Sequence, residues 1–323
     1  MGHNLGKGWA VCGEKEVRLV TENKMSALAM DQREGWIWYD GKFVPWQDAK
    51  LHILTHGLHY ASSVFEGQRS YGGVVFKQRE HTDRLIQSAK YLDFELPFTA
   101  DELDDACNEA IARNGLSNSD ATYIRPFAWR GSEELGVPAR NNKVHVAIAV
   151  WDWPSYFSME EKLKGIRMTM ARWRRPAPDT IPCKAKAAGL YMICMLSKHD
   201  AQDKGYTEAL MLDHRGLVAE ATSANIFFHR AGELHTPIAD TFLDGITRRT
   251  VIDLATRNGL KVVERRIKPE ELGDFDECFL TGTAAEITPV AEIDAVKFAP
   301  GRVCKLIVDT YAQEVRPKQA AAE

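Results

Sequence analysis

Two lysines stand one residue apart in the segment TIPCKAKAAGLYM, which runs from Thr180 to Met192. A lysine amine can form an imine with an aldehyde, so Lys184 or Lys186 could hold a cofactor that carries one. Alternate residues of an extended segment share a face, so spacing alone does not decide between the two lysines. Cys183 beside them could be a nucleophile, but no histidine is close enough in the sequence to suggest a partner for the thiol.

Two other segments have the composition of anion-binding turns. LDGITRR places Gly245, Ile246 and Thr247 where a helix is expected to begin. LTGTAAE places Gly282, Thr283 and Ala284 just after an expected strand. Exposed amides at such positions, together with a threonine hydroxyl, can hold a phosphate, although each segment alone is more simply an ordinary helix cap or turn. Neither segment matches GxxxxGK[ST] or GxGxxG, which disfavours a nucleoside triphosphate or a dinucleotide.

A lysine, a phosphate cradle and a buried acid are together the groups that pyridoxal phosphate needs. The lysine binds the cofactor aldehyde, and the acid keeps the pyridine nitrogen protonated so that the ring can accept electrons. Glu220, in LVAEATSAN, is the candidate acid, although its spacing alone favours an exposed carboxylate at a strand end. The basic run RWRRP, from Arg172 to Pro176, is interpreted as a solvated turn rather than an anion patch.

The bulk composition is that of an ordinary globular protein. The chain has 323 residues, a formal net charge of -4 and 45% hydrophobic residues, which favours two domains and gives no sign of a nucleic-acid or membrane partner. The six cysteines show neither metal-ligand spacing nor a disulfide framework. With no apolar leader and no long apolar run, the sequence indicates a cytoplasmic protein without a metal site.

Turn and capping residues predict a two-domain α+β protein. Asp40-Gly41 and Gly72-Gly73 are expected hairpin turns, and Thr99 with Glu102 forms a capping box at the start of a helix. Further helices are expected over 189–206 and 245–260 and from about 302, and strands over 121–129, 143–151 and 165–173. Strand pairs are expected over 208–220 and 224–236, and a strand leading into a turn over 277–290. The expected parts are an extension over 1–35, a small domain over 36–152, a linker over 153–164 and a large domain over 165–323.

Eight segments in one order resemble the branched-chain amino-acid aminotransferases, which are pyridoxal-phosphate enzymes of fold type IV. The segments are HGLHYASSVFEGQR, REHTDRL, YIRP, TIPCKAKAAGLY, GYTEALMLD, LVAEATSANIF, LDGITRR and TGTAAEITPV, and together they span roughly 36–290. The resemblance implies the two-domain fold of the D-amino-acid aminotransferases. It also implies an active site between the domains and at a dimer interface.

The resemblance assigns the catalytic role to Lys186, five residues before Tyr191, and leaves Lys184 as a solvated lysine. It implies a cofactor site made of Arg84, Lys186, Tyr191, Glu220, Asn225, Leu243, Ile246, Thr247 and Thr283. It implies a substrate site made of Tyr60, Phe65, Tyr123, Arg125, Val137, Trp153, Tyr156, Thr283 and Ala284, with Tyr60 and residues 135–137 supplied by a partner subunit. Gly67 and Arg69 are expected to be structural.

The chain departs from the family pattern near the substrate. Leu190 replaces a common asparagine, and Ser223-Ala224 replaces a frequent Gly-Glu pair. Arg130 is expected to narrow or charge the pocket, and either Arg130 with Arg125 or a tyrosine hydroxyl is expected to receive the distal carboxylate of glutamate. These changes leave the substrate range open.

The implied reaction is transamination between L-leucine, L-isoleucine or L-valine and 2-oxoglutarate, with ping-pong kinetics and Lys186 as the base. The implied partners are amino acids, 2-oxo acids and further copies of the chain, as a homodimer or a trimer of dimers. An amine or D-amino-acid transaminase of the same fold is the alternative. A lyase of this fold and a silent pyridoxal-phosphate-binding homologue are more distant ones.

Overall fold

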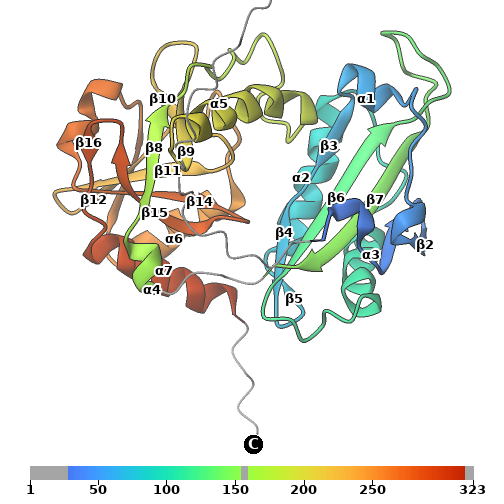
Figure 1. Cartoon of the computed structure of the whole chain (residues 1–323), viewed down its shortest axis with the longest axis horizontal. Coiled ribbons are helices and arrows are strands. Elements are labelled where there is room, and N and C mark those ends of the chain that lie inside the picture. Colours follow the sequence, from blue (N-terminus) through green and yellow to red (C-terminus); the bar gives the residue numbers. More distant parts are fainter. Residues whose placement is uncertain (1–27, 154–158, 317–323) are drawn as a thin grey trace, which may run out of the picture. The chain divides into compact units, whose positions relative to one another are not determined.

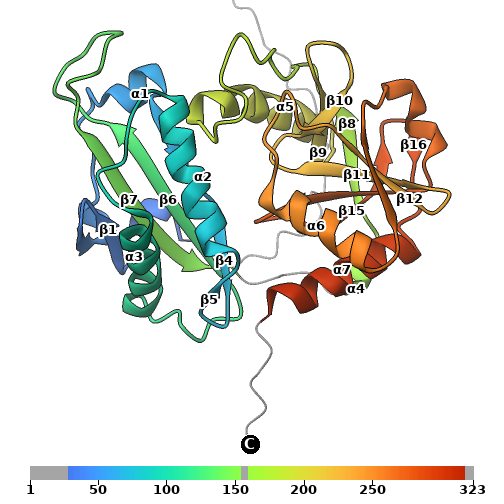
Figure 2. The same ribbon diagram turned by 180° about the vertical axis from the view of Figure 1, so that it is seen from behind.

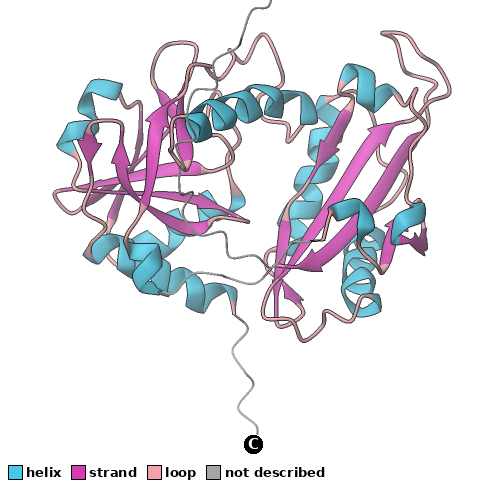
Figure 3. Ribbon diagram, viewed as in Figure 1, coloured by secondary structure: helices cyan, strands magenta, loops and turns pink. Residues whose placement is uncertain are grey.

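The computed structural model describes residues 28–153 and 159–316. Residues up to Arg33 form a unit of their own, whose described part contains one 3-10 turn at Met30–Gln32. Residues 34–323 form a second, compact unit. This second unit contains two β-sheets, each with helices packed on it (Figures 1 and 3).

The first sheet has seven strands in the order β2-β1-β7-β6-β4-β5, and β3 also pairs with β6. Its strands are β1 Trp36–Tyr39, β2 Lys42–Pro45, β3 Ser63–Phe65, β4 Gln68–Tyr71, β5 Val74–Val75, β6 Thr122–Arg130 and β7 Val144–Asp152. The predicted hairpin turn at Asp40-Gly41 is confirmed, because both residues have positive φ, 48° and 88°, as a two-residue turn between right-twisted strands requires.

Helices α2 (Gln78–Tyr91) and α3 (Ala100–Arg113) cover one face of this sheet (Figure 2). The capping box that begins α3 is present, since Thr99 Oγ1 accepts from the Glu102 amide and Glu102 returns the bond. Alternate residues of β6 then face opposite ways: Ile124 is fully buried in the core under the helices, whereas Tyr123 lines a cavity on the other side. A short helix, α1 (His56–Tyr60), precedes β3.

The second sheet has nine strands in the order β10-β9-β8-β15-β14-β11-β12-β13, with β16 paired to β15. Its strands are β8 Ile166–Met170, β9 Glu208–Leu212, β10 Val218–Ala221, β11 Asn225–Arg230, β12 Glu233–Pro237, β13 Lys261–Arg265, β14 Glu277–Gly282, β15 Glu286–Ile293 and β16 Val296–Lys297. The predicted strands are confirmed, but the segment 277–290, expected as one strand leading into a turn, contains β14 and most of β15. Strands β13 and β16 are additions that the short, half-exposed patterns did not indicate.

Helices α5 (Met192–Asp203), α6 (Ile246–Arg257) and α7 (Arg302–Val315) belong to this second half, and α6 packs with α7 on the sheet. Their positions confirm the predicted helices. The segment interpreted as a linker contains a short helix, α4 (Met159–Leu163), in the glutamate-rich stretch MEEKL.

The segment that carries the two lysines joins the two halves. Ala185, Ala187 and Leu190 are buried in the same core as the first sheet and its helices. The backbone of Ala187 forms an isolated bridge with Val64. The division into domains over 36–152 and 165–323 therefore stays a prediction, because this segment packs with both.

Candidate active site

A cavity of about 480 Å³ lies where the ends of both sheets meet the lysine segment. Its volume is within the range usual for small-molecule sites. Thirteen of the predicted site residues line it: Phe65, Arg84, Tyr123, Arg125, Lys186, Tyr191, Glu220, Asn225, Leu243, Ile246, Thr247, Thr283 and Ala284. It is also lined by Gly282 of the predicted anion-binding turn, and by Gly67, Arg175, Leu190, Cys194, Ser223, Ala224 and Thr281, which were not predicted to be site residues.

The structure separates the two lysines. The segment is not extended at this point: Ala185 N–H donates to the Pro182 carbonyl at 2.9 Å, closing a turn. Lys184 is exposed at the tip of that turn, whereas Lys186 lines the cavity. The turn breaks the alternation that would have placed both side chains on one face.

Lys186 is held by its backbone and its amine. Its N–H donates to Ser88 Oγ of α2 at 3.0 Å, and its carbonyl accepts from the Phe65 N–H at 3.1 Å. Its Nζ lies 2.8 Å from Tyr191 Oη and 4.9 Å from the centre of the Phe65 ring. These contacts fix one reactive amine in a partly apolar site.

Glu220 is buried on β10 and lines the same cavity. Burial raises the pKa of this carboxyl to about 7, although the nearby cations Arg175 and Lys186 act in the other direction. Arg175 Nε lies 3.3 Å from Glu220 Oε1. The interpretation of RWRRP as a solvated turn is therefore wrong for Arg175, which is only 4% exposed, while Arg172 and Arg174 are exposed as expected.

The raised pKa of Glu220 should make the stability of the cofactor-free protein depend on pH. The ordinary pKa of the carboxyl is 4.5, and its pKa in the folded protein is about 7. Folding therefore carries no cost from this group below pH 4.5, where it is protonated in both states, and stability is lost as the pH rises through 7. Between about pH 4 and about pH 8 we expect the free energy of unfolding of the wild type to fall by about 3 kcal/mol more than that of Glu220→Gln. Urea denaturation at both pH values measures this, and an identical pH dependence would contradict it.

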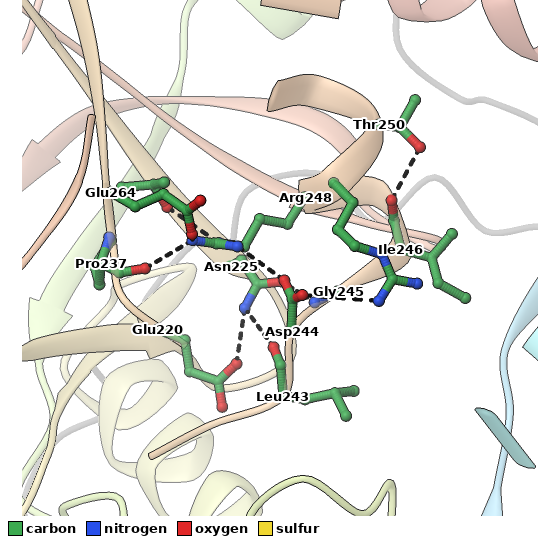
Figure 4. Close-up of polar contacts among 12 residues, drawn as sticks. Glu220, Asn225, Pro237, Leu243, Asp244, Gly245, Ile246, Arg248, Thr250 and Glu264 are labelled. Atoms are coloured by element: carbon green, nitrogen blue, oxygen red, sulfur yellow. Dashed lines mark hydrogen bonds and ion pairs between the residues drawn. The ribbon is translucent and has the colours of Figure 1, made fainter. Parts of the chain in front are cut away.

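The first turn of α6 faces the cavity without a capping side chain. Figure 4 shows how its approach is held: Asn225 at the start of β11 contacts Glu220, the Leu243 carbonyl and the Gly245 amide. The first amides of a helix without a cap are free to bind an anion. Thr281 Oγ1, also in the lining, is buried without a hydrogen-bond partner.

Arg84 enters the cavity from α2, and a residue that the sequence did not single out controls its direction. Glu66, with no exposed surface, accepts from Arg84 Nε at 2.6 Å and from Nη2 at 2.8 Å. It also accepts from His81 Nδ1 at 2.7 Å. Burial alone would raise the pKa of Glu66, but Arg84 and His81 hold it well below its usual range. Glu66 is the middle residue of FEG in the family segment HGLHYASSVFEGQR, so the sequence contained a motif that could have identified it.

Aromatic residues and one arginine line the cavity near Lys186. Phe65 and Tyr191 have ring centres 4.8 Å apart. Arg125 Nη2 donates to Tyr123 Oη at 3.1 Å, and its guanidinium lies 4.8 Å from the Phe65 ring centre. Gly67 is required here, because a Cβ at this position would lie 2.1 Å from Tyr123 Oη.

Four predicted substrate residues are not in the cavity lining of the described chain. Tyr60 is 46% exposed and Val137 is 79% exposed, on the surface of this copy. Trp153 packs against Tyr123, which does line the cavity, with ring centres 5.3 Å apart. Tyr156 is outside the described residues.

The expectation that Arg130 charges the substrate pocket is wrong. Arg130 lies five residues after Arg125 on β6, and an odd separation places the two side chains on opposite faces of the sheet. Its guanidinium donates to the carbonyls of Ala139 and Asp93 instead. Arg130 therefore ties two loops together on the helix side.

Cys183 and Cys194 are both buried, and neither is set up as a nucleophile. The Cys183 thiol donates to the Ile181 carbonyl at 3.4 Å. Burial raises the pKa of both thiols, to about 11 for Cys194. In the described residues no group of three or more His, Cys, Asp and Glu side chains could hold a metal ion. No helix in the described ranges is long and apolar enough to cross a membrane.

A pyridine ring with a phosphate fits these groups. The amine of Lys186, the buried acid Glu220 and the uncapped amides of α6 lie around one cavity. The unpartnered Thr281 hydroxyl is a further donor for a phosphate. This arrangement of an enclosed lysine, a buried acid and an anion site is typical of the pyridoxal-phosphate enzymes.

Comparison with known proteins agrees with that class. Residues 63–293 match the family model described as amino-transferase class IV, and the chain belongs to this family. It is 42% identical to the branched-chain-amino-acid aminotransferase of Pseudomonas aeruginosa over 85% of this chain and 90% of the relative. The enzyme of that name from Escherichia coli is 40% identical over 84% and 89%.

Solved structures agree in fold. The branched-chain aminotransferase of Thermoproteus uzoniensis with norvaline has a TM-score of 0.82 and 37% identity, covering 87% of this chain and 94% of that one. The branched-chain amino acid aminotransferase of Thermobaculum terrenum in its PLP form has a TM-score of 0.79 and 31% identity, covering 87% and 94%. The predicted fold type IV and the resemblance to branched-chain aminotransferases are thus confirmed.

Proposed function

We propose that this protein is a pyridoxal-phosphate-dependent transaminase that moves the amino group of L-leucine, L-isoleucine or L-valine to 2-oxoglutarate. The observation that carries the proposal is the placement of Lys186, Glu220 and the first turn of α6 around one cavity. The relatives named above, at about 40% identity over most of the chain, support the substrate class.

Pyridoxal phosphate, when bound, supplies a ring that accepts electrons from the amino-acid α-carbon. The residues of the chain hold that group and move the proton. Arg84, the amides of Ile246 and Thr247, and Thr283 would hold its phosphate. Glu220 lines the same cavity, and its carboxylate, when ionised, would stabilise a protonated ring nitrogen.

Lys186 Nζ is the base that takes the α-proton of the amino acid and returns it within the site. Tyr191 Oη, 2.8 Å from Nζ, keeps the amine on the cavity side of the segment. The backbone bonds to Ser88 and Phe65 prevent the segment from rotating. A base at a fixed position needs no rearrangement between taking the proton and returning it.

The substrate is recognised at two ends. Arg125 with Tyr123, and the amides of the turn at Thr283 and Ala284, bind carboxylate oxygens. Phe65 and the aromatic residues near it cover the aliphatic side chain, where each buried methylene contributes about 0.8 kcal/mol. Such a wall favours branched aliphatic chains without excluding one of them in favour of another.

The active form of the protein in this proposal is a homodimer in the cytoplasm. Tyr60, Leu135 and Val137 are 46%, 51% and 79% exposed apolar side chains on the surface of this copy. A second copy would cover them and bring them to its own cavity, and a trimer of dimers would do the same. Light scattering during turnover checks this; full activity in a monomeric fraction would contradict it.

A panel of single-turnover reactions tests the substrate class. The purified protein with its cofactor is mixed separately with L-leucine, L-valine, L-glutamate, D-alanine and (R)-1-phenylethylamine, and the released carbonyl product is measured. Rapid release from L-leucine, L-valine and L-glutamate, with little from the other two, is the expected result. Rapid release from D-alanine or the amine would favour the alternative transaminases, and no release from any of them would favour a silent homologue.

A further inference from the structure

We propose that Asn225 is a positioning residue that fixes the phosphate cradle at a set distance from Glu220. This inference rests on the proposed function, since it concerns how the same cavity holds pyridoxal phosphate. Asn225 is 5% exposed and begins β11, between the strand of the acid and the turn that leads into α6. It therefore lies where the two ends of the cofactor site meet.

All polar atoms of the Asn225 side chain are used. Nδ2 donates to Glu220 Oε2 at 3.3 Å and to the Leu243 carbonyl at 3.0 Å. Oδ1 accepts from the Gly245 N–H at 3.1 Å. One amide thus holds the acid and both ends of the tripeptide 243–245 (Figure 4). An amide has the donors and the acceptor that this arrangement needs, whereas a carboxylate has no donor.

Asp244, the middle residue of the same tripeptide, is held by a side chain of α6. Arg248, buried on α6, donates from Nη1 to Asp244 Oδ1 at 2.8 Å and from Nη2 to the Pro237 carbonyl at 2.9 Å. This fixes the turn to β12 but makes no connection to Glu220 (Figure 4). Of the contacts described for the turn, those of Asn225 alone reach the acid.

Gly245 shows how closely the amide fits. A Cβ at this position would lie 2.2 Å from Asn225 Oδ1, too close to be tolerated without movement. The backbone of Gly245 has φ -66° and ψ 139°, which alanine adopts without strain. The glycine is therefore needed for contact with Asn225 and not for its backbone conformation. The phosphate of pyridoxal phosphate is joined to the ring by a short methylene–oxygen arm, so its distance from the ring nitrogen is confined to a narrow range that a cradle tied to the acid would match.

The test compares the affinity of the cofactor-stripped full chain for pyridoxal phosphate and for pyridoxal, which lacks the phosphate. The Kd for pyridoxal divided by the Kd for pyridoxal phosphate measures the contribution of the cradle. Asn225→Ala should lower that ratio by about tenfold, because the Gly245 amide and Leu243 carbonyl lose their buried partner. Thr250→Val is the matched control, since the Thr250 hydroxyl donates to the Ile246 carbonyl within α6, and its ratio should stay within about twofold.

A double-variant cycle separates positioning from general damage. Gly245→Ala alone should lower the affinity for pyridoxal phosphate by about tenfold, and Asn225→Ala/Gly245→Ala should be no weaker than either single variant, because the new methyl enters the space left by the amide. Losses that multiply to about a hundredfold would overturn the inference, as would equal losses for pyridoxal and its phosphate. If Asn225→Ala does not fold, Asn225→Asp keeps the shape and loses both donors, and the same drop in ratio is expected.

Failure of the inference is distinguishable from failure of the proposed function. A wild-type ratio near one would mean that the cavity has no phosphate cradle, which would contradict the cofactor assignment itself. A large wild-type ratio that Asn225→Ala leaves unchanged would contradict only the role of Asn225.

Discussion

Replacing Lys186 with alanine is expected to lower transamination by about 10²- to 10⁴-fold, because that is the usual contribution of a positioned base that moves a proton. The amine lies in the cavity beside Tyr191, and the other lysine of the segment is exposed on the turn and cannot take its place. Steady-state formation of L-glutamate from L-leucine and 2-oxoglutarate measures the effect.

Lys184→Ala is the matched control for this experiment. It removes the same chemical group two residues away, from an exposed position outside the cavity lining, so most of the activity should remain. Lys186→Arg adds a second control, because it keeps the charge but not a basic amine at neutral pH. If Lys184→Ala were the inactive variant, the assignment of Lys186 would be wrong.

Replacing Arg84 with methionine is expected to lower the free energy of unfolding by about 3 kcal/mol, the lower end of the usual effect of removing one partner of a buried ion pair, because His81 Nδ1 still donates to the remaining carboxylate. The partner is Glu66, which has no exposed surface and receives two bonds from the guanidinium. The same change removes a cation from the cavity lining, so the affinity for pyridoxal phosphate should fall as well. Urea denaturation and cofactor titration measure the two effects separately.

Two further variants test the reason for that loss. Glu66→Gln/Arg84→Met removes both charges and should recover much of the stability but none of the cofactor affinity. Arg79→Met changes another arginine of α2, whose side chain is 49% exposed and pairs with Asp101 and Asp104, and should cost less than about 1 kcal/mol. An equal loss of stability in Arg79→Met would show that the buried pair is not the cause.

The sequence by itself determined the local structure and the identity of the reactive segments. The turn at Asp40-Gly41, the capping box of Thr99 with Glu102 and the start of α7 at Arg302 agree with the structure. Each depends on residues a few positions apart, whose preferences for turns and helix ends act without the rest of the fold. The motifs around Lys186, Glu220 and Gly245 likewise predicted which segments form the cavity.

The tertiary structure decided the direction and surroundings of individual side chains. Arg175 was expected in solvent but is buried beside Glu220, and Arg130 was expected in the substrate pocket but lies on the other face of β6. Glu66, which was not singled out, directs Arg84 from eighteen residues away in the chain. Burial and ion pairing depend on elements that are distant in sequence. For that reason a pattern of charged residues did not reveal which of them faces water and which faces the cofactor site.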